Sequence, residues 1–232
     1  MEKKQYDLCL EILRRFHKEG ILDNFVLIGS WCVFFYKDYF SASRYIDHIA
    51  LRTRDIDFLI GTPNKIKKEV DVPALLKDLG FIVIFKGEKG YVKLDHPDLI
   101  LEFLVPERGR GIDGPYKIPA LSINATALRF LDFLLTNTIK VKVENFYLTL
   151  PHPANFALHK LIIFQRRAKE DKALKDKNTA IAVLKALVDK DETNTIKSVF
   201  SSVHRKWQNK IIKGLEGSEE IKILEILQKA RH

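Results

Sequence analysis

Two aspartates, Asp55 and Asp57, alternate with the apolar residues Ile56 and Phe58 in the segment RDIDFLI. This alternation is typical of a β-strand and places both carboxylates on one face, with their Cα atoms roughly 6.5–7 Å apart. Carboxylates this close repel each other unless a cation lies between them. Their hard oxygen atoms favour Mg²⁺, with Mn²⁺ as a second candidate. Taken alone, such a pair more often belongs to a strand face that is simply solvated.

A third carboxylate, Glu102, lies inside the apolar run 99–104, which predicts another buried strand. Burial of an unpaired charge is costly, so Glu102 needs a partner there. One explanation is a salt bridge to a lysine. We favour the other, in which Glu102 is a third metal ligand beside the aspartate pair. Asp95 and Asp98 are nearby alternatives for this third acid.

A Gly-Ser pair, Gly29 and Ser30, separates the apolar run 25–28 from the apolar run 31–36. The pattern predicts a strand, a tight turn and a buried helix. Such a turn lets backbone N–H groups and the serine hydroxyl approach a phosphate at the start of the helix. The alternative is that Ser30 only caps the helix.

The rest of the first 150 residues predicts a mixture of helices and strands. Apart from the segments above, helices are expected at 4–19 and 73–79, and strands at 54–60, 81–85, 91–94, 130–135, 139–144 and 146–150. Residues 38–50 predict irregular structure, and residues 106–119, rich in glycine, proline and charge, predict a mobile loop.

The pattern becomes helical after the sequence Pro-His-Pro at 151–153. Four helices are expected beyond it, at 155–169, 173–189, 193–213 and 218–230. The predicted fold class is therefore α+β: a mixed sheet flanked by helices, followed by an all-helical C-terminal part. We place the domain boundary between residues 1–150 and residues 151–232.

The net charge of the chain is +9, and most of it lies in the helical part. Residues 151–232 hold 17 Lys and Arg against 10 Asp and Glu, a net charge of +7. A basic segment suits a polyanionic partner such as a triphosphate or a nucleic acid, although a lysine-rich solvated surface gives the same count. With two cysteines, no signal-peptide pattern and no long apolar run, the sequence predicts a cytoplasmic protein.

The order of these motifs resembles the DNA polymerase β-like nucleotidyltransferase superfamily: Gly-Ser, then Asp-x-Asp on a second strand, then one acid on a later strand. The segment LRTRDIDFLI (51–60) is similar to the Arg-Thr-x-Asp-Ile-Asp signature of AbiEii-type and related bacterial nucleotidyltransferases. LPHPANFALHKLIIFQRR (150–167) and KALKDKNTAIAVLKAL (172–187) resemble the helical part of that group. The resemblance covers roughly residues 22–190 and makes residues 1–150 a nucleotidyltransferase-like catalytic domain.

The resemblance implies a role for each matching residue. Asp55 and Asp57 would coordinate two metal positions, and Glu102 would complete the catalytic one and assist deprotonation of the acceptor hydroxyl. The nucleotide-binding residues would be Gly29, Ser30, Lys160, Lys175 and Asp176. The reaction would transfer a nucleoside monophosphate from an NTP to an acceptor in RNA, a protein or a small molecule. The 24 residues between Ser30 and Asp55 exceed the family's compact spacing, which an insertion at 38–50 would explain.

Two other classes of function remain open. The first is a non-catalytic nucleic-acid-binding protein that uses the basic helical part, for which salt-dependent binding would survive loss of the aspartates. The second is a toxin-like component of a toxin–antitoxin pair, which needs a cognate antitoxin-like partner. The sequence alone does not separate a toxin enzyme from a housekeeping one.

Overall fold

The computed structural model describes residues 3–41, 43–47, 49, 53–109, 111, 114–216 and 220–231. Their backbone divides into two compact units. The first comprises Met1–Phe34 and Ala50–Pro151, and the second comprises Phe35–Ile49 and His152–His232. The predicted boundary at 150/151 lies next to this division, but the second unit also takes residues 35–49, which the prediction assigned to the first domain.

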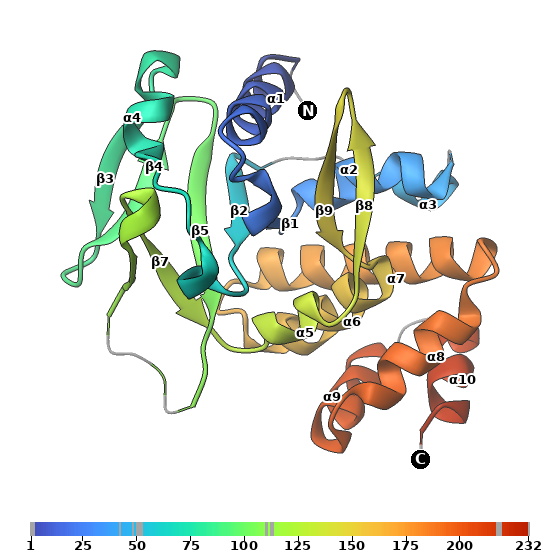
Figure 1. Cartoon of the computed structure of the whole chain (residues 1–232). Coiled ribbons are helices and arrows are strands. Elements are labelled where there is room, and N and C mark those ends of the chain that lie inside the picture. The colour runs from blue at the N-terminus through green and yellow to red at the C-terminus, as the bar shows by residue number, and fades with distance from the viewer. Residues whose placement is uncertain are drawn as a thin grey trace. The chain divides into compact units, whose positions relative to one another are not determined.

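The first unit is built on a mixed sheet (Figure 1). Its main path runs in the order β1-β2-β5-β4-β3, and β7 pairs with both β5 and β6. The strands are β1 (Val26–Ile28), β2 (Asp55–Leu59), β3 (Ile82–Lys86), β4 (Tyr91–Asp95), β5 (Ile100–Pro106), β6 (Tyr116–Ile118) and β7 (Ile123–Leu128). Strands β2 and β5 are parallel, whereas β1 and β4 run antiparallel to the strands beside them. The parallel pair β2–β5 lies at the centre of the sheet's main path.

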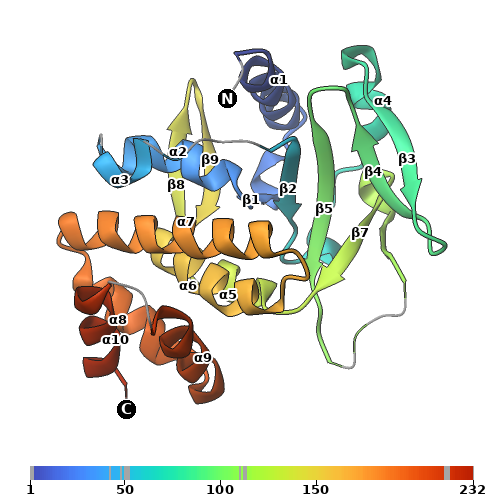
Figure 2. The same cartoon turned by 180° about the vertical axis from the view of Figure 1, so that it is seen from behind.

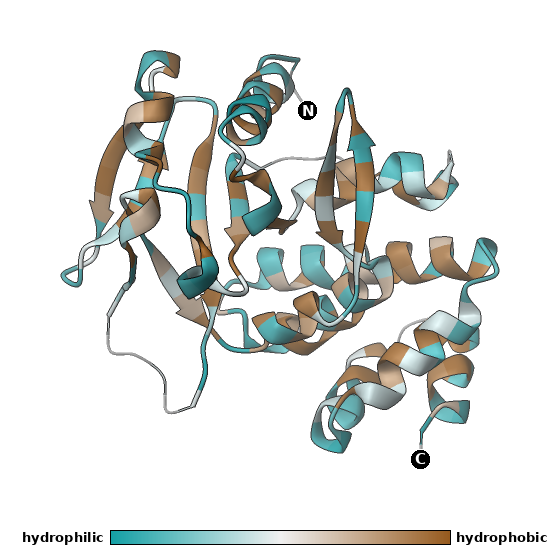
Figure 3. Ribbon diagram, viewed as in Figure 1, coloured by the Kyte–Doolittle hydropathy of each residue, from teal (hydrophilic) through white to brown (hydrophobic). Residues whose placement is uncertain are grey.

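One face of the central strands is covered by aromatic side chains. Phe58 on β2 and Phe103 on β5 are buried and stack with ring centroids 6.0 Å apart. Phe16, from helix α1 (Lys3–Lys18), meets Phe58 edge-on at 5.4 Å, and Phe25 packs against both. Successive strand residues point to opposite faces, so this apolar layer commits the neighbouring residues of β2 and β5 to the other face. A hydrophilic band accordingly interrupts the otherwise hydrophobic β5 (Figure 3).

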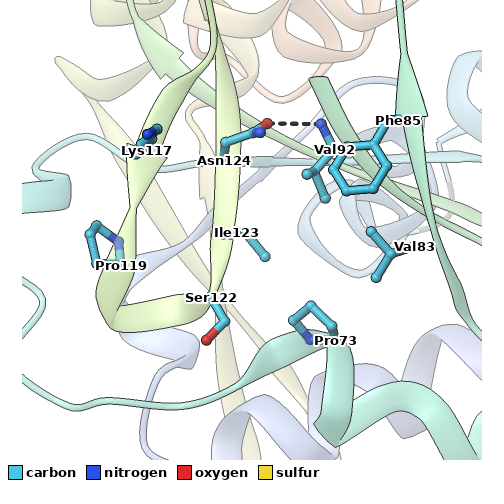
Figure 4. Close-up of a pocket in the computed structure, with 9 residues that line it drawn as sticks. All are labelled: Pro73, Val83, Phe85, Val92, Lys117, Pro119, Ser122, Ile123 and Asn124. Carbon is cyan, nitrogen blue, oxygen red and sulfur yellow. Dashed lines mark hydrogen bonds between the residues drawn. The ribbon is translucent and has the colours of Figure 1, made fainter. Parts of the chain in front are cut away.

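The side chain of Asn124 on β7 connects that strand to the loop and strand beside it. Its Oδ1 accepts from the backbone N–H of Val92 at 2.8 Å, and its Nδ2 donates to the carbonyl of Gly90 at 3.0 Å. Figure 4 shows Asn124 and Val92 at the wall of an apolar cavity of about 330 Å³, which Val83 and Phe85 also line. The cavity therefore lies on the sheet face to which Val92 points.

The prediction of a strand at 130–135 was wrong. These residues form helix α5 (Leu131–Leu135), which follows Phe130 in a left-handed conformation. Leu131 and Leu134, three residues apart, lie on one side of the helix and pack into a buried cluster with Ile28, Leu59 and Leu104. A short apolar run is compatible with either a strand or a buried helix. Here it forms a helix that packs against apolar residues near the ends of β1, β2 and β5.

The remainder of the first unit partly matches the sequence pattern. The predicted strands at 139–144 and 146–150 form a separate antiparallel hairpin, β8 (Thr138–Val143) with β9 (Phe146–Pro151). Helix α4 (Val72–Leu76) begins at Asp71, whose carboxylate accepts from the N–H of Ala74. The predicted loop at 106–119 instead contains β6, and β7 was missed altogether. Parts of that loop, residues 110, 112 and 113, lie outside the described residues.

The second unit is helical, and α6 and α7 lie alongside each other (Figure 2). Its C-terminal helices are α6 (Pro153–Ile163), α7 (Glu170–Asp189), α8 (Thr193–Ser202), α9 (Arg205–Leu215) and α10 (Ile221–Lys229). The single helix predicted at 193–213 is two helices. The break lies at Val203-His204, where Gln208 Nε2 donates to the carbonyls of Phe200 and Val203, and the His204 ring caps α9.

The prediction of irregular structure at 38–50 was wrong over most of its length. Helix α2 (Trp31–Phe40) continues into it, and helix α3 (Arg44–Asp47) follows and packs against α7. Residues 42, 48 and 50 lie outside the described residues. No helix of the described residues is long and apolar enough to cross a membrane. The predicted fold class, α+β with a mixed sheet, flanking helices and a helical C-terminal part, is confirmed.

The hydrogen bonds of Asn124 generate a prediction about stability. Asn124→Leu should lower the free energy of unfolding by about 1–3 kcal/mol, because two backbone groups lose their partner at a half-buried site. Asn124→Asp retains an oxygen for the Val92 N–H and should cost less. Urea titrations followed by circular dichroism would measure both values. Equal losses for the two variants would contradict this account.

Candidate active site

Three carboxylates meet on one face of the central strand pair. In the parallel register of β2 and β5, Asp57 lies directly opposite Glu102, and Asp55 lies opposite Ile100. Paired residues of neighbouring strands point to the same side of a sheet, so Asp55, Asp57 and Glu102 share a face. All three are half-buried, and Phe58 and Phe103 fill the opposite face. The structure thus brings together the acids that the sequence singled out.

The Gly29-Ser30 turn lies against the same carboxylates. Strand β1 pairs with β2 so that Ile28 is opposite Asp57, and the chain then turns at Gly29 with φ of +75°. A Cβ atom at Gly29 would lie 2.3 Å from Oδ2 of Asp57, so any side chain there would collide with that carboxylate. Ser30 follows, and its carbonyl accepts from the N–H of Val33 as α2 begins. Glycine at this position satisfies both the backbone conformation and the close approach.

A lysine that the sequence analysis did not single out completes this row of side chains. Strands β4 and β5 pair Leu94 with Leu101, and one more step in the same register puts Lys93 opposite Glu102. Lys93 and Glu102 form an ion pair, with 14% and 24% of their side chains exposed. The salt bridge to a lysine, considered from the sequence as one explanation of Glu102, is therefore present. Asp57, Glu102 and Lys93 lie side by side on three adjacent strands.

The pKa of Lys93 depends on its burial and on the charged residues around it. Burial lowers the pKa of its ammonium group, and the neighbouring charge of Lys86 lowers it further. Asp55 and Asp57 act in the opposite sense and favour the charged form. Lys93 is thus electrostatically coupled to both aspartates as well as bonded to Glu102.

The two alternative acids occupy different places. Asp95 lies opposite Ile100 on β4, so it shares the face of Asp55, but it is two strands away and 3.3 Å from Nη2 of Arg54. Asp98 lies in the loop after β4, with Oδ2 3.8 Å from Nδ1 of His96. Neither neighbours the aspartate pair in the sheet as Glu102 does.

The donor atoms suit a hard divalent cation, but the side chains are not gathered around one. Asp55, Asp57 and Glu102 supply only carboxylate oxygens, the ligands that Mg²⁺ prefers. Among the residues that the structure describes, no group of three or more His, Cys, Asp or Glu side chains is arranged to hold a metal ion. The carboxylate of Glu102 is bonded to Lys93 instead. The backbone positions and donor types therefore fit the metal, although one oxygen of Glu102 is engaged by Lys93.

A family model described as nucleotidyltransferase matches residues 8–204. The chain belongs to this nucleotidyltransferase family. The match covers the Gly-Ser turn, the three carboxylates and most of the helical part. No curated protein is significantly similar to this nucleotidyltransferase in sequence.

Solved structures of low sequence identity resemble it. The solution structure of the antibiotic-resistance factor ANT(2'')-Ia is 11% identical, with a TM-score of 0.43 over 84% of this chain and 95% of that one. A crystal structure of ANT(2'')-Ia in complex with adenylyl-2''-tobramycin is 13% identical, with a TM-score of 0.45 over 80% and 94%. An antigenic nucleotidyltransferase-like protein from Paracoccidioides brasiliensis is 11% identical, with a TM-score of 0.38 over 83% and 91%.

The remaining candidate residues of the nucleotidyltransferase lie in its helical unit. Lys160 on α6 and Asp176 on α7 are both 6% exposed and form an ion pair. Nε of Arg167 donates to the other oxygen of Asp176 at 2.8 Å. Burial alone would raise the pKa of Asp176, but the charges and hydrogen bonds of Lys160 and Arg167 outweigh it and lower that pKa. Lys175 precedes Asp176 on α7 and is half-buried.

The turn at Gly29 generates a prediction with a matched control. Gly29→Ala should displace the Asp57 carboxylate and lower stability by more than the roughly 1–2 kcal/mol that a left-handed alanine costs. Gly87→Ala imposes the same conformational cost at φ of +67°, but nothing lies within 4 Å of its new Cβ. Thermal unfolding of both variants would measure the difference. If Gly29→Ala were no more destabilising than Gly87→Ala, the close contact with Asp57 would not be significant.

His159 generates a prediction about pH. Burial, assisted by the charge of Lys160, lowers the pKa of His159 from 6.5 to about 3. As pH falls below 6.5 the unfolded chain takes up a proton that the folded chain refuses, so stability is lost down to about pH 3. At pH 4.5 this loss should be roughly 2–3 kcal/mol. It should disappear in His159→Phe, measured by chemical unfolding at pH 7.5 and 4.5. Equal pH dependence in both proteins would refute it.

Proposed function

We propose that the chain transfers a nucleoside monophosphate from an NTP to an acceptor hydroxyl, through the carboxylate face of the first unit. The observation that carries this proposal is the register that places Asp57 beside Glu102, with Asp55 on the same face and Gly29 against Asp57. Membership of the nucleotidyltransferase family supports it. The detailed likeness to AbiEii-type members is part of the proposal.

Each residue of the site has a separate role in the proposed transfer reaction. The acceptor oxygen attacks the α-phosphorus, the bond from that phosphorus to the β-bridging oxygen breaks, and pyrophosphate leaves with the bonding electrons. Glu102 takes the proton from the acceptor hydroxyl. Gly29 and Ser30 offer backbone N–H groups and a hydroxyl to the phosphates at the start of α2. Asp55 and Asp57 would hold the cations, which would help to orient the reacting groups.

We propose Mg²⁺, or Mn²⁺ in its place, as the cofactor, held at two positions by Asp55 and Asp57 with Glu102 completing the catalytic one. When bound, the ions neutralise the triphosphate and stabilise the attacking and leaving oxygens. In joining this set, Glu102 would share its charge with Lys93, which is bonded to its Oε1. The donor set supports this assignment, since all three residues offer hard oxygen atoms from adjacent strands.

The helical unit has an auxiliary role in this proposal. Lys160, Lys175 and Asp176 are assigned to nucleotide or acceptor contacts by resemblance. Lys160 is bonded to Asp176 and buried, so it would first have to give up that partner. The acceptor is proposed only as a class: an RNA end, a protein hydroxyl or a small molecule. Cytoplasmic location and an antitoxin-like partner remain predictions.

Metal-dependent NTP binding tests the proposed site. Calorimetry with each of the four NTPs in Mg²⁺ should show binding by the wild-type protein. Asp55→Asn and Asp57→Asn should each lower the affinity, and the rate of pyrophosphate release with an acceptor should fall at least about 100-fold. The reason is the loss of a full negative charge that holds the cation.

Asp132→Asn serves as the control, because Asp132 is an exposed aspartate on α5. It should bind NTP as the wild type does. Acceptors to be assayed include RNA, protein and an aminoglycoside such as tobramycin. Absence of NTP binding in every protein, with salt-dependent nucleic-acid binding intact, would instead indicate the non-catalytic binding protein. Growth inhibition that survives Asp57→Asn would exclude this site as the source of a toxin-like activity.

A further inference from the structure

The row formed by Asp57, Glu102 and Lys93 spans three adjacent strands on one face of the sheet. Residues directly opposite on neighbouring strands have Cβ atoms about 4.5–5.5 Å apart. The side chains of Lys93 and Glu102 therefore lie next to each other on the same face, and they form an ion pair. Lys93 is also close enough to Asp55 and Asp57 for both to act on its charge. This ammonium group is the cation bonded to Glu102 on the carboxylate face.

The apolar residues next to Lys93 along β4 do not by themselves call for a lysine at this position. Its neighbours along β4, Val92 and Leu94, point to the opposite face, toward the cavity and the core. A leucine or methionine opposite Glu102 would fill the same space, but would remove the positive charge that is bonded to Glu102 and that interacts with Asp55 and Asp57. Buried polar pairs of this kind add little net stability, which favours a role in the site itself.

We propose that Lys93 is a built-in counter-ion of the metal site, and that a divalent cation must displace its ammonium group from Glu102 in order to bind. Lys93 is then a positioning residue that sets the affinity of the site for the metal. This inference rests on the proposed function, because it takes Asp55, Asp57 and Glu102 as the metal-holding side chains. Competition is expected because the ammonium group of Lys93 is bonded to Oε1 of Glu102, so a cation held by the aspartates would share the same negative charge with it.

The flexible side chain of Lys93 makes displacement feasible. Four methylene groups let the ammonium leave Glu102 while the backbone of β4 stays in place. On the neighbouring strand β3, Lys93 is paired with Ile84, and Lys86 lies two residues further along on the same face. The positive charge of Lys86 repels that of Lys93. An incoming triphosphate brings negative charge to this face and offers the released ammonium a new partner. Metal and nucleotide should therefore bind more tightly together than separately.

Direct metal binding, without nucleotide, tests the inference. Mn²⁺ binding would be followed by electron paramagnetic resonance of the free ion, for the wild type, Lys93→Met, Lys93→Arg and Lys140→Met. Lys93→Met should bind Mn²⁺ about tenfold more tightly than the wild type, because the competing charge is gone. Lys93→Arg keeps that charge and should stay close to the wild type. Lys140→Met removes an exposed lysine from the separate hairpin and should change little.

The outcomes separate this inference from the proposed function. If Mn²⁺ binds the wild type and is lost in Asp57→Asn, but Lys93→Met binds no more tightly, the metal site stands and the counter-ion role is overturned. If no protein binds Mn²⁺, including Lys93→Met, both are overturned. Weaker binding by Lys93→Met would show that Lys93 supports Glu102 rather than competes with the metal, and would also overturn the inference.

A measurement on the wild type covers the case in which Lys93→Met does not fold. Nuclear magnetic resonance of protein labelled with ¹³C in its lysine side chains would report the ε-methylene of Lys93, assigned by its absence in Lys93→Arg. Titration with Mg²⁺ should move this signal as the ammonium leaves Glu102, while the Lys140 signal stays in place. A Lys93 signal unchanged at saturating Mg²⁺ would overturn the inference.

Discussion

Electrostatic repulsion between carboxylates is the constraint around which the first unit is built. Asp57 and Glu102 are held opposite each other by the parallel register of β2 and β5. Two like charges about 5 Å apart repel by roughly 3 kcal/mol at an effective dielectric constant of 20. The strands cannot relieve this by slipping one residue, because the slip would turn Phe58 and Phe103 out of the core. The aromatic layer therefore fixes the position of the acids on the other face.

The other features of the face follow from that constraint. A glycine is required where β1 ends, because any Cβ there would occupy the space of the Asp57 carboxylate. A positive charge nearby reduces this repulsion, and Lys93 on β4 supplies one by its ion pair with Glu102. A site that holds like charges together costs stability, so its supporting elements must be rigid. The edge strand β3 differs from the central strands in burial, because its side chains Ile82 and Phe85 are largely exposed.

Local sequence patterns predicted the acids but not their counter-ion. Alternation identified Asp55 and Asp57 as strand residues on one face, and Glu102 stood out as a carboxylate inside an apolar run. All three lie on strands as predicted. Lys93 occurs in a strand that was also predicted, at 91–94, and that extends over Tyr91–Asp95 in the structure. Its pairing with Glu102 depends on the register of β4 against β5, which no local pattern encodes. Helix α5 and strand β7 were missed for a related reason: their apolar residues fit several elements until tertiary packing selects one.

The helical unit shows how a basic composition can mislead about binding. Its net charge of +7 suggests a surface for polyanions, yet Lys160, the lysine that the resemblance selects, is buried and neutralised by Asp176. A buried and paired ammonium contributes little to the field outside the protein, whereas Arg167, bound to the same carboxylate, keeps 43% of its side chain exposed. Asp176 shares its negative charge between these two cations. An anion approaching this cluster would therefore meet the guanidinium of Arg167 first, and would gain Lys160 only by separating it from Asp176. The net charge of a segment thus overestimates the number of cationic side chains that a ligand can reach. Whether a cationic side chain is available depends on its burial and on its ion pairs.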